Sequence, residues 1–152
     1  MEALLSVIGV WVAANTGFSE PQHLPTLAFI ADGRIKQFRQ ELAHRADGTL
    51  EPGSVPESND SQDVVAFYDA RRKTIFLSQS WDARSPADQS VLVHELVHHL
   101  QKEAGATYRC PGEQEKPAYA AQADWLALYD LSLESEFGID ALTLLVRTNC
   151  LL

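Results

Sequence analysis

The spacing of hydrophobic residues predicts three elements in the first third of the chain. Apolar residues recur at helical spacing over residues 4–14, until Gly17 and the prolines after it interrupt the pattern. A short run of strand-forming residues follows at 26–30, and residues 34–44 again place apolar side chains on one helical face. We therefore expect a helix, a strand and a second helix in that order.

The middle of the chain changes from a polar stretch to a hairpin pattern. Residues 45–63 are mostly Gly, Pro, Ser, Asn, Asp and Glu without periodicity, which predicts an exposed loop. Two β-rich runs then occur at 64–68 and 74–78, joined by a charged connection at 69–73. This arrangement is typical of a β-hairpin.

A strong helix-start pattern follows the hairpin. Ser85 supplies a hydroxyl for the N-cap, Pro86 stands at the first helical position, and Asp88 places an acid three residues after the cap. The helix should continue to about Ala104, because Gly105 can adopt the left-handed conformation that ends helices.

Helices are also predicted at 115–133 and 139–146, so the complete pattern describes an α+β protein. A chain of 152 residues has the length of one ordinary domain and can bury a hydrophobic core without disulfides. We expect a single domain over residues 1–152. It should combine N-terminal helices, a short mixed or antiparallel sheet containing the hairpin, and a long helix over 85–104 followed by another helix.

Net charge narrows the choice of partners. The chain has 12 Lys and Arg against 21 Asp and Glu, a net charge of −9, which disfavours nucleic acid and anionic membranes as partners.

The apolar stretch at 4–14 has the length of a signal peptide, but its flank carries Glu2 instead of a basic residue. It is also too short to span a bilayer. We interpret it as a structural helix and expect no membrane span.

Three histidines, His94, His98 and His99, lie in the predicted helix at 85–104. Residues four apart share one helical face, so the imidazoles of His94 and His98 can converge on one metal ion, with Glu95 beside it. Zinc lowers the pKa of a bound water to about 7, and an adjacent carboxylate can take the proton as that water attacks a carbonyl. The pattern therefore predicts a Zn²⁺ site with Glu95 as the general base.

A third protein ligand is expected, because a catalytic zinc site normally has three and leaves one position for water. Cys110, Glu113 and Glu115 are the candidates, since the chain can turn at Gly105 and return beside the motif helix. A helix opening near Glu115 tolerates Pro117 in its first turn and holds the Glu115 carboxylate on a rigid element. We favour Glu115. The alternatives are Glu113, which is expected in the preceding loop, and Cys110.

The HELVH motif at 94–98, followed by Glu115 and Ala118, resembles the gluzincin branch of the zincin metallopeptidases, particularly minimal domains related to ImmA/IrrE-type proteins. The resemblance implies a zincin-like fold and a zinc peptidase acting on a peptide or protein substrate. Its metal ligands would be His94, His98 and Glu115, and Glu95 would activate the water.

The resemblance also implies where a substrate lies. In that branch a hairpin precedes the active-site helix, and its last strand forms the edge along which an extended peptide binds. Phe76, Leu77 and Ser78 match that place in this sequence. These three residues are therefore expected to form the substrate edge strand.

The group that stabilises the oxyanion has no clear motif. Peptidases of this type use a Tyr, His or Arg for it. Tyr108, Tyr119 and His99 are near enough in sequence to be candidates, and each has an alternative role as a packed aromatic or as a hydrogen-bonding group behind the metal ligands.

Two other interpretations of the chain remain: a zincin-like domain that binds or regulates a partner without efficient catalysis, and a structural domain whose motif is accidental.

Two cysteines, Cys110 and Cys150, leave three interpretations open. They could form a single disulfide, remain as buried free thiols, or provide Cys110 as a zinc ligand. A disulfide would favour an exported or periplasmic location with an upstream signal removed, and a cytoplasmic location is the alternative.

Overall fold

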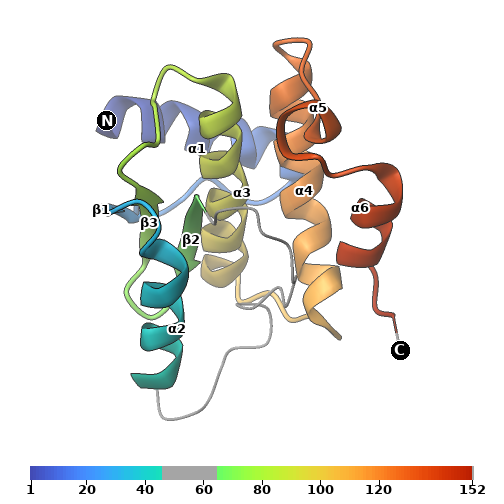
Figure 1. Ribbon diagram of the computed structural model, residues 1–152. Coiled ribbons are helices and arrows are strands. Elements are labelled where there is room, and N and C mark those ends of the chain that lie inside the picture. Colours follow the sequence, from blue (N-terminus) through green and yellow to red (C-terminus); the bar gives the residue numbers. More distant parts are fainter. Residues whose placement is uncertain (46–64, 152) are drawn as a thin grey trace.

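The computed structural model describes residues 1–45 and 65–151, which form an α+β fold (Figure 1). The predicted loop at 45–63 lies almost wholly outside these residues. The elements are α1 (Glu2–Thr16), β1 (Thr26–Ile30), α2 (Ile35–Arg45), β2 (Ala66–Asp69), β3 (Thr74–Ser78), α3 (Pro86–Glu103), α4 (Pro111–Ala127), α5 (Leu133–Phe137) and α6 (Ala141–Arg147). None of the described helices is long and apolar enough to cross a membrane.

The three strands form a mixed sheet in the order β1-β3-β2. β2 and β3 pair antiparallel and form the predicted hairpin, whereas β1 pairs with β3 in parallel. The prediction that Phe76, Leu77 and Ser78 form a sheet edge is wrong, because β3 is the central strand and both of its sides carry ladder hydrogen bonds. Hairpin patterns carry no information about a third strand from a distant part of the chain, so the sequence did not indicate this position for β3.

The two faces of the sheet are covered by different helices. Strand side chains alternate between faces, so Ile75 and Leu77 point into the main core with α1 and α3. Phe67 and Phe76 point to the other face, where their rings stack at a centroid distance of 5.0 Å and Phe38 of α2 packs against them. The sheet therefore lies between α2 and α3.

The start and end of α3 agree with the sequence prediction. The Ser85 hydroxyl accepts a hydrogen bond from the backbone N–H of Asp88, and Pro86 occupies the first turn. Gly105 follows the helix with φ +63°, the left-handed conformation expected after a helix end. The helix is anchored in the core by side chains that are almost completely buried: Leu92, Val93, Leu96, Val97 and Leu100.

The predicted helix at 115–133 is displaced and divided in the structure. α4 begins at Pro111, which occupies the first helical turn that was predicted for Pro117. Glu113 therefore lies inside the helix, and Pro117 lies in its interior. α4 ends at Ala127, before a turn in which Asp130 has φ +57°. A separate short helix, α5, follows with a capping box between Ser132 and Ser135.

Candidate metal centre

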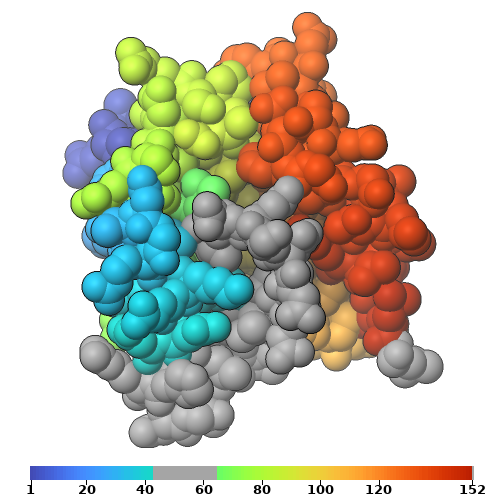
Figure 2. Space-filling view, in the orientation of Figure 1, coloured from blue at the N-terminus to red at the C-terminus, as the bar shows by residue number. Residues whose placement is uncertain are grey.

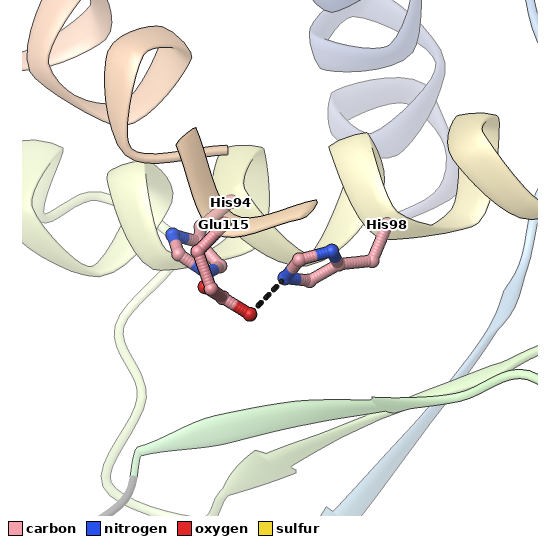
Figure 3. Close-up of side chains that lie close together, drawn as sticks. All are labelled: His94, His98 and Glu115. Atoms are coloured by element: carbon pink, nitrogen blue, oxygen red, sulfur yellow. Dashed lines mark hydrogen bonds and ion pairs between the residues drawn. The ribbon is translucent and has the colours of Figure 1, made fainter. Parts of the chain in front are cut away.

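The three side chains that were predicted from the sequence to be metal ligands converge in the structure (Figure 3). His94 and His98 project from α3 toward Glu115 of α4. The Nε2 atom of His94 lies 3.0 Å from Oε2 of Glu115, and the Nε2 atom of His98 lies 3.3 Å from Oε1. One ligand atom from each residue falls within 4.8 Å of the other two, so the cluster could hold a metal ion.

Close packing between α3 and α4 makes this convergence geometrically feasible. Ala118 and Ala121 are almost completely buried on α4, and their small side chains allow the two helix backbones to approach. On the same face of α4, Glu115, Tyr119 and Gln122 follow one another at spacings of four and three residues. One face of α4 therefore presents three polar side chains to the histidines of α3.

The orientation of the His98 ring is fixed by Gln101. The side-chain Nε2 of Gln101 donates to the backbone carbonyl of Gln114 at 2.9 Å, and a carbonyl can only accept. The amide oxygen of Gln101 must therefore face Nδ1 of His98, 2.9 Å away, and Nδ1 must carry the proton. His98 consequently turns its Nε2 atom toward Glu115.

Gln122 fixes His94 in the same way. The Ser90 hydroxyl donates its single proton to the carbonyl of Ala87 at 2.6 Å, so it accepts from the side-chain Nε2 of Gln122 at 3.3 Å. The amide oxygen of Gln122 then faces Nδ1 of His94 at 3.0 Å, and Nδ1 donates to it. Metal-binding histidines commonly donate their second ring N–H in this manner, which fixes the tautomer.

With both tautomers fixed, positive charge is needed between the two Nε2 atoms and the carboxylate of Glu115. If Nε2 of each ring carried no proton, two lone pairs would face a carboxylate, so either added protons or a metal ion must lie between them. Burial works to lower the pKa of His98, but the hydrogen bond and charge of Glu115 raise it to about 9. Burial works to raise the pKa of Glu115, yet the two histidines hold that pKa well below its usual range. The cluster therefore accommodates positive charge, which either protons or a metal ion could supply.

Glu95 is buried beside the cluster but is not one of its three converging ligands. Its negative charge acts on His98 and also on the hydroxyl of Tyr119. This position, next to His94 on α3, is the one expected for a base if a metal ion with a bound water occupies the cluster.

Of the three oxyanion candidates, Tyr119 is the one that contacts a predicted ligand. Its ring packs edge-on against the ring of His94 with centroids 4.6 Å apart, and its hydroxyl accepts a hydrogen bond from Arg147 at 3.2 Å. Burial raises the pKa of Tyr119, and the positive charge of Arg147 opposes that rise.

His99 and Tyr108 have other surroundings. His99 is fully buried, and its ring nitrogens bond the Tyr68 hydroxyl at 2.9 Å and the backbone carbonyl of His23 at 2.8 Å. It therefore ties β2 and the segment before β1 to α3. Tyr108 lies near the side chain of Gln101, and burial raises its pKa. It is a neighbour of the group that holds His98.

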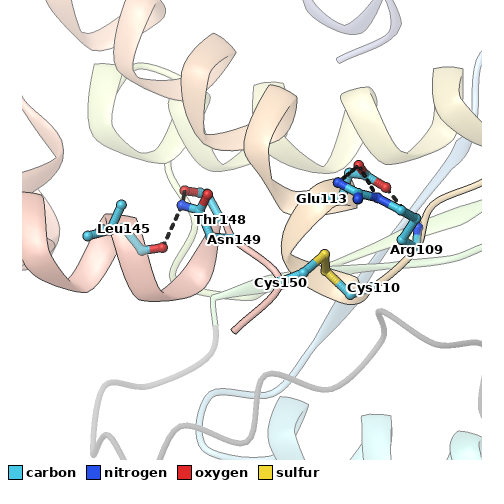
Figure 4. Close-up of a disulfide and its surroundings, with 7 residues drawn as sticks. All are labelled: Arg109, Cys110, Glu113, Leu145, Thr148, Asn149 and Cys150. Atoms are coloured by element: carbon cyan, nitrogen blue, oxygen red, sulfur yellow. Dashed lines mark hydrogen bonds and ion pairs between the residues drawn. A yellow bond between two sulfur atoms is a disulfide. The ribbon is translucent and has the colours of Figure 1, made fainter. Parts of the chain in front are cut away.

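The alternatives for the third ligand are used elsewhere. Cys110 forms a disulfide with Cys150, with the two Cα atoms 5.7 Å apart, which removes its thiolate from the ligand candidates (Figure 4). Glu113 lies in the first turn of α4, where its carboxylate accepts hydrogen bonds from the backbone and side chain of Arg109. Among the three candidates, Glu115 is the one that meets the histidines.

Three residues that contact the cluster or interact with its charges were not identified from the sequence. Gln101 and Gln122 had no motif of their own, although Gln122 follows Glu115 at a spacing that shares its helical face. Arg39, on α2, is partly buried, and its charge interacts with those of Glu95 and Glu115. Burial lowers the pKa of Arg39, and the two carboxylates oppose this effect. Arg39 follows Ile35 by four residues and so shares its helical face. This spacing was the only signal for Arg39 in the sequence.

The fold and the site define an α+β domain with a partly buried His–His–Glu cluster that could hold a metal ion. The chain belongs to a family described as Domain of unknown function (DUF6647), whose model matches residues 1–152. Searches of curated proteins and of solved structures found no match.

Proposed function

We propose that the protein is a zinc-dependent peptidase that hydrolyses peptide bonds. The observation that carries the proposal is the pair of glutamine-held imidazoles, whose Nε2 atoms face the carboxylate of Glu115. A simple structural ion pair does not require both rings to be fixed in the tautomer that a metal needs. The resemblance of the HELVH motif to gluzincins supports the same function.

The donor set fits zinc. Two imidazole nitrogens and one carboxylate oxygen are the ligands of one common class of catalytic zinc site. Ligands about 2.0–2.1 Å from a tetrahedral ion lie roughly 3.3 Å from one another. The distances of 3.0 and 3.3 Å between the histidine nitrogens and the Glu115 oxygens are close to that value. The set leaves a fourth position for water, because Cys110 is engaged in its disulfide.

In this proposal each residue has a defined task. Bound zinc would polarise the scissile carbonyl and lower the pKa of a water molecule toward 7. His94, His98 and Glu115 hold the ion, while Gln101 and Gln122 keep both rings oriented. Glu95 accepts the proton of the attacking water and returns it to the leaving amine.

A peptide substrate would be expected along β2 instead of β3. β2 is an outer strand of the described sheet, and Tyr68 on β2 contacts His99 of α3. An extended chain can add to an exposed sheet edge through backbone hydrogen bonds. The substrate-strand role that the sequence assigned to Phe76–Ser78 is therefore transferred to the neighbouring strand Ala66–Asp69.

The proposal is tested by separating metal binding from chemistry. Zinc-loaded wild type and Glu95→Gln are compared on a library of internally quenched peptides. Glu95→Gln should retain zinc and lose hydrolysis by on the order of 10²–10⁴-fold, because only the proton acceptor is removed. Glu113→Gln is the matched control, since its carboxylate pairs with Arg109 away from the histidines.

Two results would contradict parts of the proposal. Zinc binding by the wild type without cleavage of any peptide would favour a metal-containing module that binds a partner. Equal cleavage by wild type and Glu95→Gln would remove Glu95 from the mechanism.

A further inference from the structure

The C-terminal segment of the described chain reaches the candidate metal centre through one side chain. Arg147 is the last residue of α6, and it donates a hydrogen bond to the hydroxyl of Tyr119 on α4. Tyr119 in turn packs against His94. Two contacts therefore connect a C-terminal arginine to a predicted metal ligand.

The hydrogen bond from Arg147 determines what the Tyr119 hydroxyl can do. A guanidinium has only donors, so the phenolic oxygen is the acceptor and keeps its own proton. Within residues 1–45 and 65–151 this hydroxyl makes no second hydrogen bond, so its proton is available to an incoming acceptor. A positive charge on the oxygen side also makes the phenol a stronger donor.

The location of Tyr119 suits a donor that serves the metal centre. It follows Glu115 by four residues on α4 and so lies on the same face, one turn away. The charges of both Glu115 and Glu95 act on its hydroxyl, which places that hydroxyl within electrostatic range of the ligand and the base.

The segment that carries Arg147 is held against α4 by two further features (Figure 4). Cys150 is joined to Cys110, the residue immediately before α4. The backbone of Asn149 packs directly on Gly112, where an added Cβ would meet the Asn149 carbonyl oxygen at 2.5 Å. Arg147 is therefore placed by a covalent bond and by a close backbone contact, both at the start of α4.

We propose that Arg147 is a positioning residue for catalysis: it orients the Tyr119 hydroxyl to donate a hydrogen bond to the substrate carbonyl oxygen, and the Cys110–Cys150 disulfide holds it there. This inference rests on the peptidase function proposed above. The hydroxyl stabilises the negative charge that develops on the carbonyl oxygen when water adds, and its proton stays on the phenol. The disulfide thereby becomes part of the catalytic architecture as well as of the fold.

Kinetics on the zinc-loaded protein provide the first test. Tyr119→Phe should lower kcat by on the order of 10²–10³-fold with little change in KM, because a donor to the transition state is removed. Arg147→Gln should lower kcat by a smaller factor, and Arg147→Lys should recover part of the loss. Zinc content and the thermal midpoint measured by circular dichroism should remain at wild-type values in all three variants.

A spectroscopic readout separates positioning from a purely structural role. The ring signals of Tyr119, assigned by their absence in Tyr119→Phe, are recorded by NMR on the zinc-loaded protein at one neutral pH. Arg147→Gln removes the charged donor to the phenolic oxygen and should shift these ring signals, whereas Arg147→Lys should return them toward their wild-type positions.

The disulfide is tested by Cys110→Ser/Cys150→Ser, alone and combined with Arg147→Gln. The cysteine variant should lose kcat, and adding Arg147→Gln should cause little further loss, because both changes remove the same contact. Full kcat in Tyr119→Phe or in Arg147→Gln, or Tyr119 ring signals that do not change in Arg147→Gln, would overturn this inference while leaving the peptidase function intact. Absence of hydrolysis by the zinc-loaded wild type would overturn the function itself.

Discussion

At the scale of single residues, the site depends on which side-chain atoms face one another. The convergence of His94, His98 and Glu115 could be predicted from the HELVH motif and from the residues that follow it, because spacing along a helix is a local property. The roles of Gln101 and Gln122 could not be identified, because each depends on a partner that α3 and α4 bring together only in the folded chain.

Metal content provides the most direct prediction at this scale. Wild type reconstituted with zinc and dialysed should retain about one ion per chain, and His94→Ala and Glu115→Ala should lose it, since each removes one ligand of three. Elemental analysis measures this directly. Glu113→Ala, which alters a carboxylate on the same helix outside the cluster, should behave as wild type.

The pH dependence of the zinc-free protein follows from the same residues. The pKa of His98 is raised from 6.5 to about 9 on folding, so its stabilising contribution is fully present below pH 6.5 and is lost as pH rises toward 9. The pKa of Glu115 is lowered from 4.5, so its contribution is present above pH 4.5 and is lost on acidification. The free energy of unfolding, measured with urea in chelator, should therefore peak between pH 4.5 and 6.5.

A control variant assigns this profile to the cluster. Glu115→Gln removes the carboxylate that raises the His98 pKa, so the decline between pH 6.5 and 9 should largely disappear. An unchanged decline in Glu115→Gln would assign it to groups elsewhere in the protein.

At the scale of elements, capping and close contact decide where the helices lie. α3 could be predicted with both of its ends because Ser85, Pro86 and Gly105 are local signals. The start of α4 was misplaced because two prolines compete for its first turn, and Pro111 occupies it. The central position of β3 was missed because it depends on pairing with β1, far away in sequence.

The N-cap of α3 offers a measurable test of this local signal. Ser85→Ala removes the acceptor for the Asp88 backbone N–H and should lower the free energy of unfolding by about 1 kcal/mol. Ser85→Asp keeps an acceptor at the same place and should retain most of the stability. Urea denaturation of the two variants beside wild type measures the difference.

Gly112 tests the contact between the start of α4 and the C-terminal segment. An alanine at this position would bring its Cβ to 2.5 Å from the carbonyl oxygen of Asn149, so Gly112→Ala should cost about 1–3 kcal/mol of stability. In Cys110→Ser/Cys150→Ser the segment can move away, and the same substitution should cost less. An equal cost in both backgrounds would show that the disulfide does not hold the segment in place.

At the scale of the whole molecule, the sheet lies between α2 on one face and α1 and α3 on the other. Figure 2 shows the α2 region and the C-terminal helices on opposite sides of the face in view, and α6 is connected to α4 by a hydrogen bond. The class α+β followed from the alternation of patterns along the chain. The arrangement of the helices around the sheet required the structure, because it depends on contacts between distant segments.

Metal binding should stabilise the molecule as a whole, because the ligands come from two helices. An ion that binds the folded chain raises the free energy of unfolding by about 2.7 kcal/mol at a free concentration of 100 times Kd. The thermal midpoint should therefore rise with added zinc and fall with chelator. His94→Ala/His98→Ala should show neither change, and a shift that persists in this variant would place the bound ion elsewhere.

The two glutamine-held imidazoles also have a consequence for the speed of metal capture. Both Nε2 atoms already face the position of the ion, so neither ring must rotate when metal arrives. The remaining obstacle is the proton on His98, whose pKa is raised to about 9, so the fraction of the protein that is free of this proton increases as the solution becomes more alkaline. In a stopped-flow experiment, uptake should therefore be a single second-order process whose rate constant increases with pH, with no slow conformational phase. The site would therefore be preorganised for metal binding, and the rate of binding would depend on deprotonation.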